Sequence, residues 1–375
     1  MLLRRTKPVA TAPDDTRLNS LTGMRIFAAV WVMLLHFRQV SEDRTWEIPL
    51  IDRFVLSGQY AVDLFFVLSG FILSHVYFTQ FASGLTRPTF RSFISYRFAR
   101  LYPVHIVTFA IMVVLFFGQS ILTGTSTAQD SGRYSVGVFF STLTMTHAWW
   151  GSGTTQTPNV PAWSISAEWF AYLLFPLLCL AIVRLRGFAP LVFTLAGVGL
   201  ALLWHATDDN ALVRVMAGFL VGMATYRFAR HAERLATLPW LGTVVLALVV
   251  VWATVGGARL EIGILLFAAL ILVLSSERDW LCRIFALRWM VYLGEVSYAV
   301  YMVHWVVRVI VRAAAEKAGV LDTAPGGLIV GTYIVVTFGA AILLYHFVER
   351  PWRRRLRRLL APRPKVAETD GEIRP

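Results

Sequence analysis

Residues 58–81 read GQYAVDLFFVLSGFILSHVYFTQF, and this stretch decides the class of fold. Apart from Asp63 it holds no Asp, Glu, Lys or Arg. A helix needs about 20 predominantly apolar residues to cross roughly 30 Å of hydrocarbon, and this stretch is long enough. It therefore predicts a membrane-spanning helix.

Similar apolar runs recur along almost the whole chain. Of its 375 residues, 57% are hydrophobic and 15% charged, whereas soluble domains are roughly 45–50% apolar and about 25% charged. The runs do not alternate apolar and polar residues as the strands of a membrane barrel do. We therefore expect an all-α, polytopic membrane bundle of about ten helices. The expected spans are 19–38, 58–81, 101–118, 163–183, 188–205, 211–227, 238–255, 260–276, 289–311 and 326–348.

The net charge is +13, and the Lys and Arg residues cluster in short segments between these runs and in the tail. Cytoplasmic loops of membrane proteins carry an excess of Lys and Arg, so this placement predicts that both termini are cytoplasmic. It argues against nucleic acid as a partner and for contact with membrane lipid, in a bacterial inner membrane. We expect a cytoplasmic segment 1–17, a membrane domain 18–355 and a basic, polar tail 356–375.

Two further features restrict the possibilities. Cys179 and Cys282 are far apart and lie in or beside apolar runs, so neither a disulfide framework nor a metal site is indicated. The first apolar run has no small-residue cleavage site, and we expect no cleavable signal peptide.

Inside the first span lie the ionisable residues Arg25 and His36, with Arg38 at its end. Such groups are costly in hydrocarbon, so each suggests a function. Eleven residues of helix place them about 16 Å apart along the axis and on nearly the same face. Arg25 could hold an anionic donor, and His36 could take a proton from an acceptor. The alternative is that Arg25 extends to the inner interface and His36 makes an interfacial hydrogen bond.

The second span brings Asp63 to a depth similar to that of His36. Asp63 could therefore orient the imidazole and stabilise its charged form, as a carboxylate does in a triad. We expect Arg25, His36 and Asp63 to converge on one shared cavity. Ser69 and Gly70 offer a small-residue surface, suited to a close helix crossing or to the passage of a ligand. Ordinary packing of these two small residues is the alternative.

Polar residues recur around four later spans. We expect Arg97 and Arg100 to form a basic turn that opens the third span and to share a helix face, which suits phosphate recognition; positive-inside charge is the strong alternative. Glu168 lies one turn after Ser164, so both should face the bundle interior. Near the last two spans we expect Tyr301 and His304 to share a face and Glu349 to pair with basic residues at the inner side. The supporting polar set is Trp163, Ser164, Glu168, Tyr301, His304 and Glu349.

Taken in series, these motifs resemble the acyltransferase 3 family of integral-membrane acyltransferases. The matching elements run from about residue 18 to 355. They are Arg25 with ten residues before His36, Val62-Asp63 through Ser69-Gly70-Phe71, Arg97-x-x-Arg100, Trp163-Ser164-x-x-x-Glu168, Ser297-Tyr-x-x-Tyr301-x-x-His304 and Phe347-Val-Glu349-Arg-Pro. The resemblance implies O-acylation of carbohydrates, and of macrolides in some members, with acyl-CoA as co-substrate and no bound cofactor.

The resemblance also implies that His36 is the catalytic residue and that Arg25, Arg97 and Arg100 serve donor binding or transfer. We place Asp63 and Arg25 with His36 in the catalytic group, Arg25 as a candidate for stabilising the oxyanion, and we add Ser69 to the donor site. The expected acceptor is a carbohydrate or glycolipid. Some members carry a fused SGNH-type domain, which we do not expect in this chain.

Two other functions remain open on the sequence. A transporter or flippase would line a substrate path with the same polar residues. A non-catalytic scaffold would use them for folding. The polar segment 119–162 contains Trp149 and Trp150, which suit either stacking on sugar rings or an interfacial aromatic belt.

Overall fold

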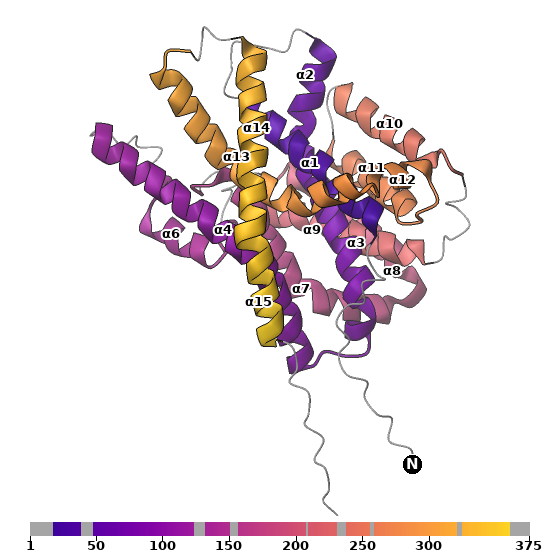
Figure 1. The fold of residues 1–375 in the computed structure, drawn as a ribbon. Coiled ribbons are helices and arrows are strands. Elements are labelled where there is room, and N and C mark those ends of the chain that lie inside the picture. Colours follow the sequence, from indigo (N-terminus) through magenta and orange to yellow (C-terminus); the bar gives the residue numbers. More distant parts are fainter. Residues whose placement is uncertain are drawn as a thin grey trace, which may run out of the picture.

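The structure is a computed structural model, which describes residues 18–38, 48–123, 132–150, 157–207, 209–230, 238–255, 259–320 and 325–360. In these ranges it is helical, with no strand. The expected cytoplasmic segment 1–17 and the tail beyond residue 360 lie outside the described residues. Figure 1 shows the helices packed into one bundle, with α14 and α15 continuing each other along one side.

The helices follow the apolar runs closely. Their bounds are α1 Asn19–Arg38, α2 Pro49–Leu56, α3 Ala61–Ala82, α4 Arg87–Thr123, α6 Val136–Leu143, α7 Trp163–Leu185, α8 Ala189–Trp204, α9 Ala211–Ala229, α10 Leu241–Thr254, α11 Leu260–Leu274, α12 Trp280–Phe285, α13 Arg288–Lys317, α14 Gly326–Leu344 and α15 Arg350–Leu360. A π-helical turn, Tyr345–Glu349, joins α14 to α15.

Each of the ten expected spans coincides with a helix, which confirms an all-α bundle. Within the described ranges, seven stretches are long and apolar enough to cross a membrane, with α7 and α8 forming one continuous stretch. The apolar helices α10 and α11 are shorter, at 14 and 15 residues. The protein is therefore a multi-pass membrane protein. The count of ten crossings and the side of the termini stay predictions.

The third span differs from the expectation. Arg97 and Arg100 do not lie in a turn before the helix, because α4 starts at Arg87 and is 37 residues long. At 1.5 Å per residue it measures about 55 Å, well beyond the hydrocarbon thickness of roughly 30 Å. The reason is that residues 87–100, although polar, can continue a helix outside the hydrocarbon. Both arginines are thereby held on a rigid helix.

Two close helix crossings fix the centre of the bundle. Where α3 crosses α9, a Cβ on Gly70 would lie 2.2 Å from the Phe219 carbonyl oxygen, and one on Gly222 would lie 2.0 Å from that of Val67. Real Cβ atoms never come so near, so glycine is required at both positions. The expected close approach at Gly70 is confirmed. A similar crossing of α1 and α13 depends on Gly294.

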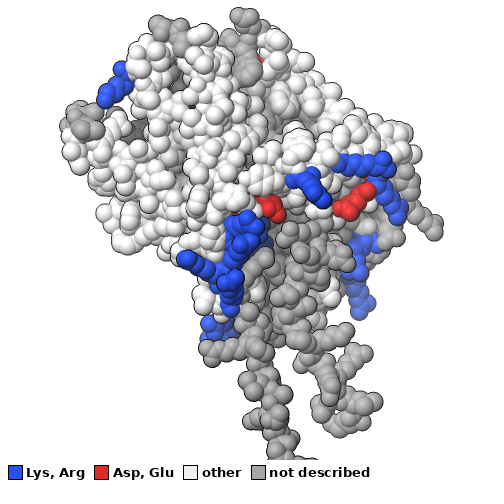
Figure 2. Space-filling view, in the orientation of Figure 1, with Lys and Arg blue, Asp and Glu red and all other residues white. Residues whose placement is uncertain are grey.

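Charge is distributed unevenly over the surface. Figure 2 shows Lys and Arg side chains gathered on the lower half of the molecule, where α15 lies, while the upper half is mostly uncharged. Large apolar side chains are exposed on the bundle, among them Leu195, Val335 and Leu343. An exposed apolar belt above a basic end is typical of a membrane protein with one side rich in arginine.

Candidate active site

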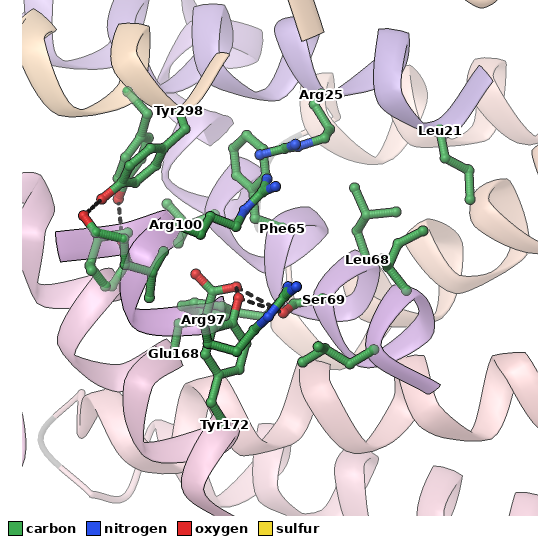
Figure 3. A pocket seen from close by; sticks show the side chains of 18 of the residues that line it. Leu21, Arg25, Phe65, Leu68, Ser69, Arg97, Arg100, Glu168, Tyr172 and Tyr298 are labelled. Carbon is green, nitrogen blue, oxygen red and sulfur yellow. Dashed lines mark hydrogen bonds between the residues drawn. The ribbon is translucent and has the colours of Figure 1, made fainter. Parts of the chain in front are cut away.

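A cavity of about 200 Å³ lies inside the bundle, between α1, α3, α4, α7 and α13. Figure 3 shows how its polar side chains meet in a common space. Four are charged: Arg25 from α1, Arg97 and Arg100 from α4, and Glu168 from α7. The polar neutral ones are Thr22, Ser69, Ser164, Tyr172, Tyr298 and Tyr301.

The cavity holds an excess of positive charge. Arg25 and Arg100 extend toward each other in Figure 3, and neither has an ion-pair partner among the described residues. The Arg25 guanidinium lies 5.9 Å from the centre of the Phe65 ring. Arg97 donates to the Tyr77 hydroxyl at 3.2 Å, while its Nε is buried without a partner. Three cations facing one carboxylate in a poorly hydrated space favour an anionic ligand.

Glu168 is held in place by hydroxyl groups rather than by an arginine. Its Oε1 accepts hydrogen bonds from Ser69 Oγ at 2.8 Å and from the Tyr172 hydroxyl at 2.5 Å. Ser69 comes from α3 and Tyr172 from the next turn of α7, so the carboxylate ties these two helices together across the cavity. Ser164 lines the same cavity, and the prediction that Ser164 and Glu168 face the interior is confirmed.

A pair of histidines lies beside the cavity. His36 Nδ1 and His304 Nε2 are 3.1 Å apart, a hydrogen-bond distance. The His36 ring stands edge-on to Trp305, with 5.2 Å between ring centres. Tyr301 links the pair to the cavity, because it lines the cavity, bonds Ser164 at 2.7 Å, and places its ring 5.9 Å from that of His304.

Comparison with known proteins shows the family to which the chain belongs. The family model for the acyltransferase domain named acyltransferase 3 matches residues 18–346. The chain belongs to this family. The acyltransferase is 29% identical to the acyltransferase MdmB of Streptomyces mycarofaciens, over 96% of this chain and 98% of MdmB.

A second relative is the peptidoglycan O-acetyltransferase OatA of Listeria monocytogenes. The acyltransferase is 23% identical to it over 89% of this chain and 56% of OatA, so the match spans about half of OatA's length. No solved structure matches the chain. The expectation of an acyltransferase is thereby confirmed.

The expected contact between Asp63 and His36 is wrong. Both Asp63 oxygens accept hydrogen bonds from Arg214 on α9, at 3.0 and 2.7 Å, and Asp63 is fully buried. Arg214 also lies over the rings of Trp204 and Trp163, at 4.7 and 5.4 Å. A buried carboxylate is stabilised best by the two parallel hydrogen bonds of a bidentate guanidinium. An imidazole cannot donate two such bonds to one carboxylate. Arg214 was missed, although a charged residue inside an apolar run was the signal.

The expectation that Arg25, His36 and Asp63 share one cavity is also wrong in this structure. Arg25 lines the cavity, but His36 and Asp63 do not. The 11-residue separation on α1 keeps Arg25 and His36 about 16 Å apart. The acyltransferase therefore has a cationic cavity and a separate histidine pair, connected through Tyr301.

Glu349 does not line the cavity, but it interacts with two of the arginines that do. It is buried and accepts from Arg353 at 3.3 Å, so the expected pairing with a basic residue is confirmed. Its second oxygen has no hydrogen-bond partner, and the carboxylate interacts electrostatically with Arg25 and Arg100. Within the described ranges, no group of three or more His, Cys, Asp or Glu residues could hold a metal ion.

Part of the segment 119–162 is described, at 119–123, 132–150 and 157–162. Trp149 donates its indole N–H to the Ser166 carbonyl at 2.9 Å, whereas Trp150 is 76% exposed. His147 donates its Nε2–H to the Ala162 carbonyl, 3.0 Å away, and burial lowers its pKa to about 3. Trp149 is thus fixed against α7, and Trp150 is the tryptophan of this segment that remains available for contact.

Proposed function

We propose that this acyltransferase resides in a bacterial inner membrane and moves an acyl group, most simply acetyl, from cytoplasmic acyl-CoA to a hydroxyl of a surface or secreted carbohydrate or glycolipid. The observation that carries the proposal is the cationic cavity, connected through Tyr301 to the His36–His304 pair. Family membership supports the acyl chemistry. The name of OatA supports a carbohydrate acceptor.

The donor end of the reaction uses the arginines. Phosphate groups bind best to guanidinium groups that present several N–H donors in a fixed fork. In the proposal Arg25, Arg97 and Arg100 bind the pyrophosphate of CoA at the inner side. The extended pantetheine arm then carries the thioester toward His36, since the 16 Å between Arg25 and His36 excludes contact of one acyl carbonyl with both.

The acceptor end uses the histidine pair. If His36 Nδ1–H donates to His304 Nε2, the lone pair on His36 Nε2 is free to act as the base. His36 Nε2 takes the proton of the acceptor hydroxyl while the hydroxyl oxygen forms a bond to the thioester carbonyl carbon. The carbon–sulfur bond then breaks, and the thiolate leaves and is protonated from His36 or water. A second route conserves atoms and electrons equally well. In it, His36 first takes the acyl group covalently and the acceptor hydroxyl then takes the acyl group from His36.

The test uses proteoliposomes with acetyl-CoA on one side and an oligosaccharide acceptor on the other. Wild type should release CoA thiol and acylate the oligosaccharide in equal amounts, and His36→Ala should lose both. His205→Ala is the matched control, because His205 is exposed at the end of α8. Retained acylation in His36→Ala would overturn the mechanism.

The same assay separates the two other functions. Movement of the oligosaccharide across the membrane without release of CoA thiol would indicate a transporter. Loss of folded protein in Arg25→Gln and His36→Ala, with wild type inactive on every donor, would indicate a scaffold. Folded variants with lost turnover support the enzyme.

A further inference from the structure

A second cationic site lies on α15, outside the cavity. A recess of about 280 Å³ is lined by His346, Pro351 and four arginines, which are Arg350, Arg354, Arg355 and Arg358. No acidic side chain is among the residues that line it. None of the four arginines has an ion-pair partner in the described ranges. Figure 2 shows Lys and Arg side chains gathered over this part of the surface.

The spacing of these residues forms one stripe. His346, Arg350, Arg354 and Arg358 follow one another at intervals of four along the continuous helix of Tyr345–Glu349 and α15. Residues four apart lie on the same helix face, so the charges of Arg350, Arg354 and Arg358 repel one another and destabilise the helix. Arg353 is different, because Glu349 neutralises it. An anion bound along the stripe would remove the repulsion.

The recess adjoins the donor cavity. Glu349 lies next to Arg350 in the chain and interacts electrostatically with Arg25 and Arg100 in the cavity. In addition, α15 packs against α4, the helix that carries Arg97 and Arg100. The start of α15, next to Glu349, is therefore the part of the stripe nearest to the cavity arginines.

The length of the stripe argues against a lipid headgroup as its ligand. From His346 to Arg358 the stripe extends about 18 Å along the helix axis. The headgroup layer is roughly 5–8 Å thick on each side of the hydrocarbon. Figure 1 shows α15 continuing straight from α14, and a stripe of this length along a straight helix is longer than the headgroup layer is thick.

We propose that the α15 recess binds the terminal phosphomonoester of the acyl donor, which in CoA is the 3′-phosphate. The inference rests on the proposed function, in which the cavity arginines bind the pyrophosphate. A phosphomonoester carries nearly two negative charges and three acceptor oxygens, which matches several unpaired guanidinium groups. Arg354 and Arg358 would recognise it, with His346 and Arg350 on the cavity side.

The experiment compares CoA with 3′-dephospho-CoA. Dissociation constants are measured for the full chain in nanodiscs of phosphatidylcholine. Wild type should bind CoA about tenfold more tightly than dephospho-CoA. The double variant Arg354→Gln/Arg358→Gln should lose this preference by weakening CoA alone, and Arg354→Lys/Arg358→Lys should keep most of it. Arg283→Gln/Arg288→Gln removes the same charge from exposed positions elsewhere and should leave the preference unchanged.

The outcomes distinguish this inference from the proposed function. A tenfold preference that survives in Arg354→Gln/Arg358→Gln overturns the recess as the phosphate site, while CoA binding by wild type still supports the donor. Arg100→Gln, in the cavity, should weaken both ligands by a similar factor. If wild type binds neither, the donor assignment and the recess both fall. If phosphatidylglycerol in the nanodisc abolishes the preference, the recess binds lipid headgroups and the inference is overturned.

Discussion

The His36–His304 contact offers a direct test of the catalytic arrangement. In the structure His304 Nε2 lies 3.1 Å from His36 Nδ1, and His304 is fully buried. When His36 takes a proton it becomes a cation, and its hydrogen bond to His304 becomes charge-assisted. Such a bond is worth about 1.5–3 kcal/mol. With about 1.4 kcal/mol per factor of ten, His304→Ala should lower kcat roughly 10- to 150-fold.

The KM for the donor should not change, because the cavity arginines do not contact His304. His304→Gln places a carbonyl oxygen near the position of Nε2 and should recover most of the rate. The assay is CoA thiol release with a saturating acceptor, on protein of verified thermal stability. An unchanged rate in His304→Ala would refute the positioning role. Equal loss in the Ala and Gln variants would refute the hydrogen bond as its cause.

Three further predictions concern stability. Asp63→Asn leaves the Arg214 cation buried without its counter-charge and should cost about 3–5 kcal/mol, measured by thermal unfolding in detergent; an unchanged melting temperature would contradict the pair's structural role. Gly222→Ala should lower the yield of folded protein, because its Cβ would lie 2.0 Å from the Val67 carbonyl oxygen, whereas Gly199→Ala has open space and should be neutral. Since His147 is neutral in the fold, with its pKa lowered to about 3, the unfolded chain binds more protons below pH 6.5. The free energy of unfolding should therefore fall by about 2 kcal/mol from pH 7 to pH 5, and the melting temperature should fall with it. Both changes should be smaller in His147→Gln.

The sequence predicted the helices well because each apolar run is a local property. Lipid satisfies no backbone hydrogen bond, so a run long enough to cross the hydrocarbon has to be helical whatever its neighbours are. The same cost argument marked Arg25, Glu168 and Glu349 as residues that need a polar surrounding, and the structure gives them one. The same cost applies to Arg214, which was not among the predicted site residues.

The partners of these residues were harder to predict. Asp63 and His36 were expected at a similar depth in neighbouring spans, and depth alone made them a plausible pair. In the fold, Asp63 binds Arg214, which is 151 residues away, and His36 meets His304, which is 268 residues away. Depth fixes one coordinate of a side chain. The rotation of the helix and the choice of neighbour fix the other two, and these depend on contacts across the whole bundle.

What the sequence determined by itself is therefore the class of the protein: an all-α membrane bundle with buried charges and a basic side. Those features follow from the free energy of placing each residue in hydrocarbon, which is set residue by residue. The tertiary structure alone decided that three arginines from α1 and α4 meet in one cavity, while the two histidines pair outside it. Such convergence depends on glycine-mediated crossings like those at Gly70 and Gly222, which set how closely and at what angle the helices meet.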